Sequence, residues 1–453
     1  MIKQIQRILY FGVLVLLIAS CSGVSKNAVE SSLGNVFPDG TPISEWFLDT
    51  VKVDPTSLGE WYSITEAGAV ADDKTINTQV IQALIDEVSS IGGGVIVVPE
   101  GTFKTGALFF KPGTHLHIKK GGVLKGSDDI ADYPKMPSRM EGQNLDYYPA
   151  LINAYKVDDF TITGEGTIDG NGAKFWDAFW ARRKENPKCT NLEVSRPRLV
   201  FLWDCDHAVV QDVHLERSGF WTTHLYQCNW AKLIDLHIYA PFEPVRAPSS
   251  DAIDLDVCSN VVVRGCYMSV CDDAVVMKGG KGPFADEDSN NGKNEFILIE
   301  NNNFGKCHST FTIGSESIHT KNVLVRNNHM TEATRMVYLK MRPDTPQIYE
   351  YITIEGYTGT ASIGVFINPW TQFYDLKGRK DPPSSISRNI TFKNITGEFN
   401  QFTKVSKRDD DILQNFAFEG INVTAKGAKL DSTLFNGLTI KNSKVNGEIW
   451  NGK

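Results

Sequence analysis

The sequence has no long apolar run except residues 8–19, no nucleotide-binding loop, no nucleic-acid motif and no metal-ligand spacing. After that run, no stretch is long and apolar enough to cross a membrane. The formal net charge is −8, so the field of the whole chain does not attract polyanions, and an acidic ligand would need local basic residues. We therefore expect no nucleic-acid partner, no metal and no cofactor, and we expect a monomer.

Cysteine is scarce: there are 8 in 453 residues, and an odd number of them follows residue 21. An odd number argues against a complete disulfide framework. Cys205, Cys228 and Cys258 each precede a similar apolar strand, and their spacings do not suit zinc. The sequence therefore predicts a buried stack of small apolar side chains at these positions.

The N-terminus has the pattern of a processing segment. Lys3 and Arg7 precede the apolar run, which is too short to span a bilayer and closes with Ile18-Ala19-Ser20-Cys21. This ending resembles a bacterial lipobox with Cys21 as the lipidated residue; the alternative is an ordinary signal peptide with a chance cysteine. We predict a lipoprotein signal peptide over 1–21, a tether and irregular lead-in over 22–60, and one domain over 61–453. The expected location is the envelope of a Gram-negative bacterium, anchored by lipid to either face of the outer membrane.

What the sequence does contain is a repeat of short strands. Apolar runs such as Val261–Val263, Val323–Val325 and Ile390–Phe392 recur between Asn and Gly turns. Such a period, in the twenties of residues, is typical of a parallel β-solenoid, in which every coil adds to one continuous core. Residues 75–91 follow a helical period that ends at Gly92, so we expect a helix there that covers the open end of the solenoid. The fold class is therefore all-β.

Acidic residues stand one repeat apart. Asp251 and Asp273 are 22 positions apart, and each opens a short apolar strand. Equivalent residues of consecutive coils lie about 4.8 Å apart, so Asp251, Asp272 and Asp273 should crowd into one patch. Like charges that close cannot all be ionised cheaply, so at least one pKa should rise. A general acid and a general base can then be made from the same residue type.

The pair Asp272-Asp273 carries a further prediction. In a regular strand the two side chains would point to opposite faces, and one would be buried at high cost. We therefore expect both at a bend, facing outward. Strands that open at 251, 273, 311, 337 and 365 can be placed in register on successive coils. This ladder sets Lys278, His308 and Lys340 beside the carboxylates.

At these residues the chain resembles the polygalacturonases and related pectin hydrolases of glycoside hydrolase family 28. That family has the ordered motifs Asn-Thr-Asp, Gly/Gln-Asp-Asp, Gly-His-Gly and Arg-Ile-Lys on a right-handed parallel β-helix. The corresponding segments here are Ser249-Ser250-Asp251, Cys271-Asp272-Asp273, His308-Ser309-Thr310 and Tyr338-Leu339-Lys340. Further likeness lies in Gly164–Gly172, Arg196-Pro197 and Phe220-Trp221, and the whole spans about residues 60–400.

The resemblance implies a role for each matched residue. Asp272 would be the general acid, and Asp251 and Asp273 would activate water. His308 would tune the acid or hold the sugar, and Lys340 would pair with a uronate carboxylate. The family inverts the anomeric configuration, whereas the residues alone leave inverting and retaining action open.

The departures from the family point to specificity. The glycines that flank the histidine are replaced by Cys307 and Ser309, and Tyr338 stands where a polygalacturonase has Arg. A tyrosine suits stacking on a neutral sugar better than pairing with a carboxylate. This favours cleavage next to rhamnose in rhamnogalacturonan, or of a terminal galacturonate.

Long insertions are expected to shape the cleft. They lie at about 170–197, 281–293 and 369–388, and the first and last could close one end and give exo action. The basic and aromatic residues weighed as sugar contacts are Lys278, Arg342 and Trp221 in the first rank, then Arg246, Arg264, Lys281, Arg335, Trp176, Trp180, Trp370 and Tyr374.

Other functions stay open at this point. An endo-polygalacturonase of the same family differs only in the shape of the cleft. A calcium-dependent pectate lyase would need an acidic calcium site and a basic residue such as Lys278, and its product would absorb in the ultraviolet. A non-catalytic glycan-binding lipoprotein would bind without turnover, and the Asp272-Asp273 pair argues against it.

Overall fold

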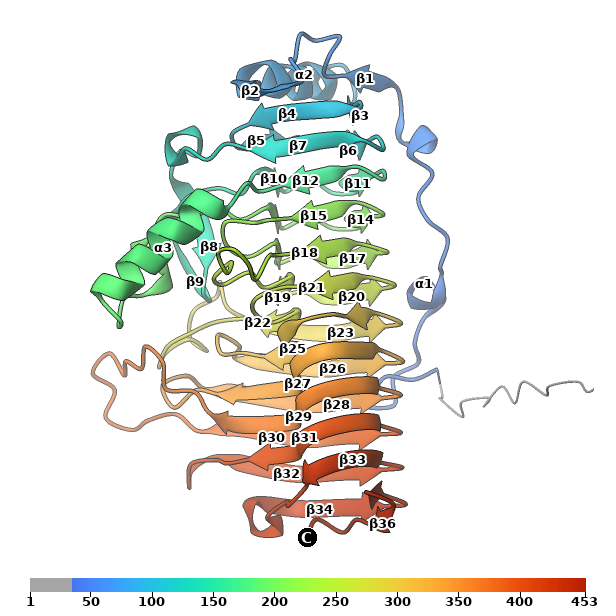
Figure 1. Ribbon diagram of the computed structural model, residues 1–453, viewed down its shortest axis with the longest axis vertical. Coiled ribbons are helices and arrows are strands. Elements are labelled where there is room, and N and C mark those ends of the chain that lie inside the picture. The colour runs from blue at the N-terminus through green and yellow to red at the C-terminus, as the bar shows by residue number, and fades with distance from the viewer. Residues whose placement is uncertain (1–34) are drawn as a thin grey trace, which may run out of the picture. The chain divides into compact units, whose positions relative to one another are not determined.

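Short parallel strands stack coil upon coil from Trp61 onward and form the right-handed parallel β-helix that was predicted (Figure 1). The structure is a computed structural model that describes residues 35–453. The predicted signal peptide and its Cys21 lie outside the described residues. In the described part, no helix has the length and apolarity needed to cross a bilayer.

One side of the solenoid is a sheet of 13 strands, and it contains the strand-like runs seen in the sequence. Each strand pairs in parallel register with the next coil, as Val261 with Ile297 and Ile297 with Val323. In order, the strands are β1 (Trp61–Ser63), β3 (Gly94–Val98), β6 (Thr114–Ile118), β11 (Thr161–Thr163), β14 (Val209–Gln211), β17 (Asn229–Ile234), β20 (Ser259–Arg264), β23 (Lys293–Glu300), β26 (His319–Arg326), β28 (Gln347–Glu355), β30 (Ser385–Lys393), β32 (Ile412–Glu419) and β34 (Phe435–Lys441).

The remaining sides belong to a 21-stranded sheet with two parallel series that merge in the long strand β27 (His329–Met341). The series that carries the acidic ladder is β5 (Leu108–Phe110), β10 (Ile152–Tyr155), β13 (Val200–Trp203), β16 (Thr223–Tyr226), β19 (Ile253–Asp256), β22 (Val275–Lys278), β25 (Cys307–Ile313), β27, β29 (Thr358–Pro369), β31 (Thr396–Val405), β33 (Asn422–Gly427) and β35 (Lys444–Val445). The other series is β2 (Asp72–Ile76), β4 (Gly101–Thr105), β7 (Gly122–Gly126), β12 (Thr167–Asp169), β15 (His214–Glu216), β18 (His237–Tyr239), β21 (Tyr267–Ser269) and β24 (Asn303–Phe304). A short strand, β36 (Glu448–Ile449), pairs antiparallel with β35 at the C-terminal end.

The core is one continuous column of apolar side chains that point inward from both sheets. Cys205, Cys228 and Cys258 lie inside it, fully buried and unpaired in disulfides, which confirms the predicted stack. Because every coil shares this core, register along the column is fixed by packing as well as by hydrogen bonds.

The N-terminal end of the column is covered by helix α2 (Thr78–Ser90). The helix was predicted from residue 75, but residues 72–76 form strand β2, and the buried side chain of Asn77 separates the two by bonding Val70 and Lys104. Ile81, Ile85 and other apolar residues of α2 face the core, so the helix hides a sheet end that would otherwise offer unpaired groups.

The described part of the predicted tether is not free of the solenoid. Residues 36–58 include α1 (Glu45–Leu48) and η1 (Pro55–Leu58), and they lie along the outer face of the 13-stranded sheet. Phe37 and Phe47 are buried there against Val262 and Leu298. Arg264, weighed as a sugar contact, instead donates to the carbonyl of Asp49 at 2.9 Å. Burial of such phenyl groups, worth about 2 kcal/mol each, explains why this segment is held to the sheet.

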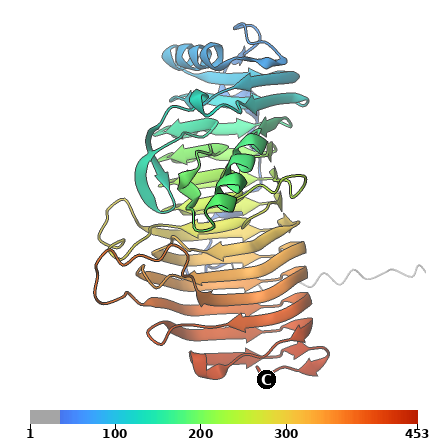
Figure 2. The same ribbon diagram turned by 60° about the vertical axis from the view of Figure 1, so that its left-hand side comes forward.

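The insertions leave the coils on one side of the molecule. They comprise the antiparallel hairpin β8 (Met136–Met140) and β9 (Gln143–Tyr147), helix α3 (Ala173–Glu185), the single turn η3 (Asn191–Glu193) and loops at 279–292 and 370–384. Figure 2 shows α3 and the loop after β29 on this same side. The hairpin was not predicted. Short turns, η2 (Ile130–Asp132) and η4 (Ser432–Leu434), lie elsewhere.

Candidate active site

A cavity of about 390 Å³ opens where the acidic ladder meets the insertions. Its carboxylates are Glu141, Asp251, Asp272, Asp273 and Glu316. Its cationic side chains are Arg183, Arg246, Lys278, Arg335 and Lys340, and His308 lies among them. Its aromatic side chains are Phe179, Trp180, Trp221, Tyr338, Trp370 and Phe373. The cavity is thus highly charged but closely balanced in sign.

The three predicted acids come together as the repeat required. Asp251 and Asp273 each stand two residues before the paired Ile253 and Val275, so they occupy the same position on consecutive coils. Residues 271–274 form the predicted bend before β22. The side chain of Asp272 is 29% exposed, whereas that of Asp273 is 2% exposed beneath Lys340 rather than facing outward.

Charge crowding separates the pKa values of these acids. Burial, together with the nearby Asp254 and Asp272, raises the pKa of Asp251 well above its usual value, which confirms the predicted rise. Burial also acts to raise the pKa of Asp272, but the hydrogen bond to His308 and the charge of Lys340 outweigh it and hold that pKa below its usual value. In the free site, Asp251 therefore holds a proton more strongly than Asp272 does.

His308 bridges the acids and a cation. Its Nδ1 lies 3.2 Å from Asp272 Oδ1, and its Nε2 lies 2.7 Å from Nη2 of Arg246. Its backbone N–H donates to the carbonyl of Asp272, because β25 follows β22 in the ladder. Replacement of the flanking glycines therefore leaves this histidine in register with the second acidic motif.

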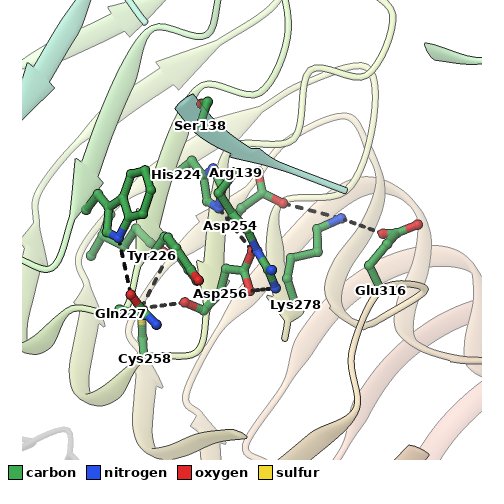
Figure 3. A network of polar contacts seen from close by, with 12 residues as sticks. Ser138, Arg139, His224, Tyr226, Gln227, Asp254, Asp256, Cys258, Lys278 and Glu316 are labelled. Atoms are coloured by element: carbon green, nitrogen blue, oxygen red, sulfur yellow. Dashed lines mark hydrogen bonds and ion pairs between the residues drawn. The ribbon is translucent and has the colours of Figure 1, made fainter. Parts of the chain in front are cut away.

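Lys278 lies under the cavity floor rather than in the open, with its side chain 5% exposed. Its Nζ is 3.5 Å from Asp251, 3.5 Å from Asp254 and 3.3 Å from Glu316, as Figure 3 shows for the last two. The ammonium also sits 4.4 Å from the centre of the Trp221 ring, which is itself buried. Although burial acts to lower it, these carboxylates hold the pKa of Lys278 well above its usual value. Lys278 and Trp221, both predicted to touch substrate, line the cavity, and Lys278 also holds three carboxylates together.

A second charged cluster supports the floor from behind (Figure 3). Arg139, from hairpin β8–β9, pairs with Asp256 of β19 through Nε at 2.9 Å and Nη2 at 3.1 Å. Nε2 of His224 lies 3.4 Å from the carboxylate of Asp256. On the other side of the imidazole ring, Nη1 of Arg198 lies 2.7 Å from Nδ1 of His224. Burial acts to raise the pKa of Asp256, but Arg139 and His224 lower it to about 2. The ionised Asp256 thus fastens the hairpin to the ladder.

Lys340 and Tyr338 occupy the wall formed by β27. Lys340 Nζ is 2.6 Å from Asp273 Oδ2, and the carboxylates raise its pKa although burial opposes them. The ring of Tyr338 stacks on Phe366 at 4.7 Å, and the guanidinium of Arg335 lies 4.8 Å from the Tyr338 ring and 5.1 Å from the Phe366 ring. Tyr338 is only 3% exposed, so little of its ring is open and the expected stacking of a sugar on it is not favoured. Arg335 supplies a cation beside the position where the family has Arg.

Arg342 does not reach the cavity, which corrects its prediction as a substrate-binding residue. Its side chain is buried, and it forms paired hydrogen bonds with Asp344 at 2.7 and 2.8 Å. It also donates to the carbonyls of Gln372 and Phe373 at 3.2 and 3.1 Å. A guanidinium with five donors can hold a loop in this way. Arg342 therefore shapes the 370–384 wall.

The two long insertions wall the cavity as expected. Phe179, Trp180 and Arg183 reach it from α3, and Trp370 reaches it from the loop after β29. Trp176 is instead buried, with its Nε1 donating to the carbonyl of Ser218, and Tyr374, which is exposed, does not line the cavity. Lys281 pairs with Glu141 at 3.3 Å at the rim.

Three arginines in the cavity have no carboxylate partner among residues 35–453. Arg183 contacts the carbonyl of Pro187, Arg246 contacts His308 and the carbonyl of Cys271, and Arg335 contacts the carbonyl of His308. The Nε atoms of Arg183 and Arg335 are buried without a hydrogen-bond partner. Guanidinium groups that face a cavity without a carboxylate partner favour an anionic ligand.

Two clusters in the described part could ligate a metal. Asp272, Asp273 and His308 hold donor atoms within 4.8 Å of one another, as do His214, Glu216 and His237 on β15 and β18. In the first cluster, Lys340 already pairs with Asp273 and one donor is an imidazole, whereas calcium takes oxygen ligands. This arrangement does not favour the calcium-dependent lyase.

Sequence reasoning missed site residues supplied by the insertions. Glu141 and Arg139 come from the turn and strand of hairpin β8–β9, which has no motif. Arg183 lies in a helix whose aromatic face was noticed but whose basic face was not.

Asp254 provides a test of the buried charges. Burial raises its pKa from an ordinary value of 3.8 to about 7, so the folded state holds a proton that the unfolded chain loses. The contribution of this group to stability is therefore full below about pH 4 and is lost as pH rises to about 7. Asp254→Asn, which cannot titrate, should flatten the fall in melting temperature between pH 5 and pH 8. Asp410→Asn, at an exposed position, is the control, and an equal fall in all three proteins would contradict the result.

Comparison with known proteins agrees with this geometry. The glycosyl hydrolases family 28 profile matches residues 91–445. A probable polygalacturonase of Vitis vinifera is 31% identical over 227 residues, which cover 48% of this chain and only 44% of that protein. An exo-poly-alpha-D-galacturonosidase of Dickeya chrysanthemi is 25% identical over 475 residues, covering 92% of this chain and 76% of the relative.

Among solved structures, a hyperthermoactive exopolygalacturonase from Thermotoga maritima has a TM-score of 0.70 at 22% identity, over 86% of this chain and 92% of that one. This likeness shows a common fold. The family match covers more than half of the chain and includes the whole acidic ladder. The chain therefore belongs to glycosyl hydrolases family 28.

Proposed function

We propose that this protein hydrolyses α-linked galacturonic acid in pectin, acts at chain ends and works as a monomer. Membership of the family makes it a glycosidase. The observation that carries the substrate is the cavity's charge: a patch of three carboxylates lies beside arginines that have no carboxylate partner in the described part of the chain. The carboxylates suit acid–base cleavage of a glycoside, and the free guanidinium donors suit a sugar acid. The names of the grape and Dickeya relatives agree with this substrate.

The proposed reaction uses each carboxylate once. Asp272, the most exposed of the three, donates a proton to the glycosidic oxygen as the bond to the anomeric carbon breaks. Asp251 and Asp273 hold a water molecule, which attacks that carbon and gives up its proton to a carboxylate. Lys340 keeps Asp273 in place for this role.

The pKa order of the free site is opposite to the order that this reaction needs. Asp251 holds a proton more strongly than Asp272 does, whereas the general acid, Asp272, must be protonated. A bound uronate would bring a negative charge and expel water beside Asp272, and both changes raise the pKa of a carboxyl. We propose that the anionic substrate itself brings Asp272 to its acid form.

Asp272→Asn tests the role of the acid. The variant should lower kcat at least about a hundredfold, the usual scale of general acid catalysis, with an unchanged melting temperature because the replacement is nearly isosteric. Proton NMR of the early product of the wild type should show an inverted anomer. Near wild-type turnover in the variant would remove Asp272 from the mechanism.

The walls of the cavity support action at chain ends. Helix α3 and the loop after β29 both contribute side chains to the cavity, so a polymer would meet insertions along the cleft. Because Tyr338 is only 3% exposed and Arg335 lies beside its ring, we propose galacturonide ends as the preferred ligand rather than rhamnose-containing ones.

A time course on homogalacturonan and rhamnogalacturonan tests this specificity. Free galacturonic acid should be the first product, released faster from homogalacturonan ends, while viscosity falls slowly because internal bonds stay intact. Early medium-length products with a rapid loss of viscosity would show endo action. A product that absorbs in the ultraviolet would indicate a lyase.

We propose that the protein is anchored to the cell envelope by lipid on Cys21, on the strength of the lipobox-like segment Ile18–Cys21. Cys21→Ala should move the protein from the membrane fraction to the soluble fraction in a Gram-negative host. An unchanged membrane fraction in the variant would contradict the lipid anchor.

A further inference from the structure

A chain of short contacts joins the insertion helix α3 to Asp272. The indole Nε1 of Trp180 donates to the carbonyl of Arg246 at 2.7 Å. Nη2 of Arg246 donates to the carbonyl of Cys271 at 2.7 Å and lies 2.7 Å from Nε2 of His308. On its other side, Nδ1 of His308 lies 3.2 Å from Asp272 Oδ1. The helix therefore contacts the proposed acid through Arg246 and His308.

The chemistry of these groups fixes which nitrogen of His308 carries the proton. A guanidinium has only donors, so Nε2 must accept from Arg246 through its lone pair. A neutral imidazole has one N–H, which then belongs to Nδ1 and points at Asp272. The ionised carboxylate of Asp272 is an acceptor, so the assignment is consistent at both ends of the ring.

Arg246 also holds the backbone beside the acid. The two hydrogens of its Nη2 serve one contact each: the ring of His308 and the carbonyl of Cys271, the residue that precedes Asp272. One nitrogen thus fixes both the orientation of the Asp272 peptide and the ring that bonds its side chain. Arg246 forms no ion pair among the described residues that would draw its guanidinium away.

Trp180 is the part of the insertion that holds Arg246. It lies on α3, which is fixed to the coils by the buried Phe175, Trp176 and Phe179. Among the described residues, the indole N–H of Trp180 is the only hydrogen-bond donor to the carbonyl of Arg246. The insertion that narrows the cavity therefore also contributes to the position of the acid.

We infer that Arg246 is a positioning residue that keeps His308 as the Nδ1–H tautomer and thereby orients Asp272, with Trp180 anchoring it to α3. This rests on the proposed role of Asp272. Arg246 is not part of the four motifs that resemble the family's: it lies three residues before Ser249, in the loop between β18 and β19.

The first experiment reads the tautomer directly. Long-range proton–nitrogen NMR of protein with ¹⁵N-labelled histidine, with His308→Gln for assignment, should show Nδ1 protonated and Nε2 unprotonated in the wild type. Arg246→Met should let Nε2 take a proton. Arg246→Lys, which keeps a cationic hydrogen-bond donor group, should restore part of the wild-type signal. Arg183→Met removes another cavity guanidinium without touching the ring, so its His308 signals should not move.

The second experiment measures kinetics on galacturonide oligomers with the same variants. Arg246→Met should lower kcat about tenfold or more, the scale expected when a reacting group is misplaced, with KM changed less than about twofold. Trp180→Phe, which keeps an aromatic ring but loses the indole N–H, should lower kcat to a smaller extent. Arg183→Met should act mainly on KM.

The outcomes separate this inference from the proposed function. A protonated Nε2 in the wild type, or an unchanged tautomer in Arg246→Met, overturns the inference whatever the activity. A raised KM with unchanged kcat in Arg246→Met would make Arg246 a binding residue and also overturn it. If Asp272→Asn keeps its turnover while the tautomer behaves as expected, the proposed acid fails and the fixing of His308 by Arg246 stands.

Discussion

Parallel register between neighbouring coils is the constraint on which the whole site depends. Val275 pairs with Ile253 on one side and with Phe311 on the other, and all three side chains lie in the closed core. The register places the first acid of one coil beside the acid pair of the next, and that pair beside His308. A slip of one residue would turn every side chain to the opposite face, so the packing of the core protects the geometry of the acids.

Buried ion pairs lie directly beneath the candidate active site. Lys278 is surrounded by Asp251, Asp254 and Glu316, and Lys340 covers Asp273. Removing one member of such a group leaves an uncompensated buried charge, which destabilises a protein strongly. Stability and chemistry are therefore coupled here: the lysines that allow acids to crowd in the fold also set which acid holds a proton.

The insertions determine how a ligand can enter the cavity, whereas the coils of the solenoid supply the acidic and basic residues proposed to carry out the reaction. Coils supply the acids and their cations at fixed spacing, whereas α3, hairpin β8–β9 and the 370–384 loop close over them. Each insertion is fastened by a buried ionic or polar contact, as Arg139 with Asp256, Trp176 with the carbonyl of Ser218, and Arg342 with the carbonyls of Gln372 and Phe373. Because the walls and the catalytic ladder come from different parts of the fold, the insertions can change without altering the positions of the acids on the coils.

The sequence by itself determined the solenoid, the capping helix, the cysteine stack and the acid patch, because each depends on a local period that packing then repeats. The family match agrees with the order of the motifs. The ladder also placed His308 and Lys340 correctly beside the carboxylates, since register follows from strand spacing.

Only the tertiary structure decided what the long side chains do. Arg342 turns from the cavity to hold a loop, Tyr338 is enclosed by Phe366 and Arg335, and Arg246 reaches His308 from a separate loop. No repeat period fixes these contacts. They arise where insertions without periodicity fold back on the coils, and the direction of a flexible arginine is set by whichever buried acceptor lies within its reach.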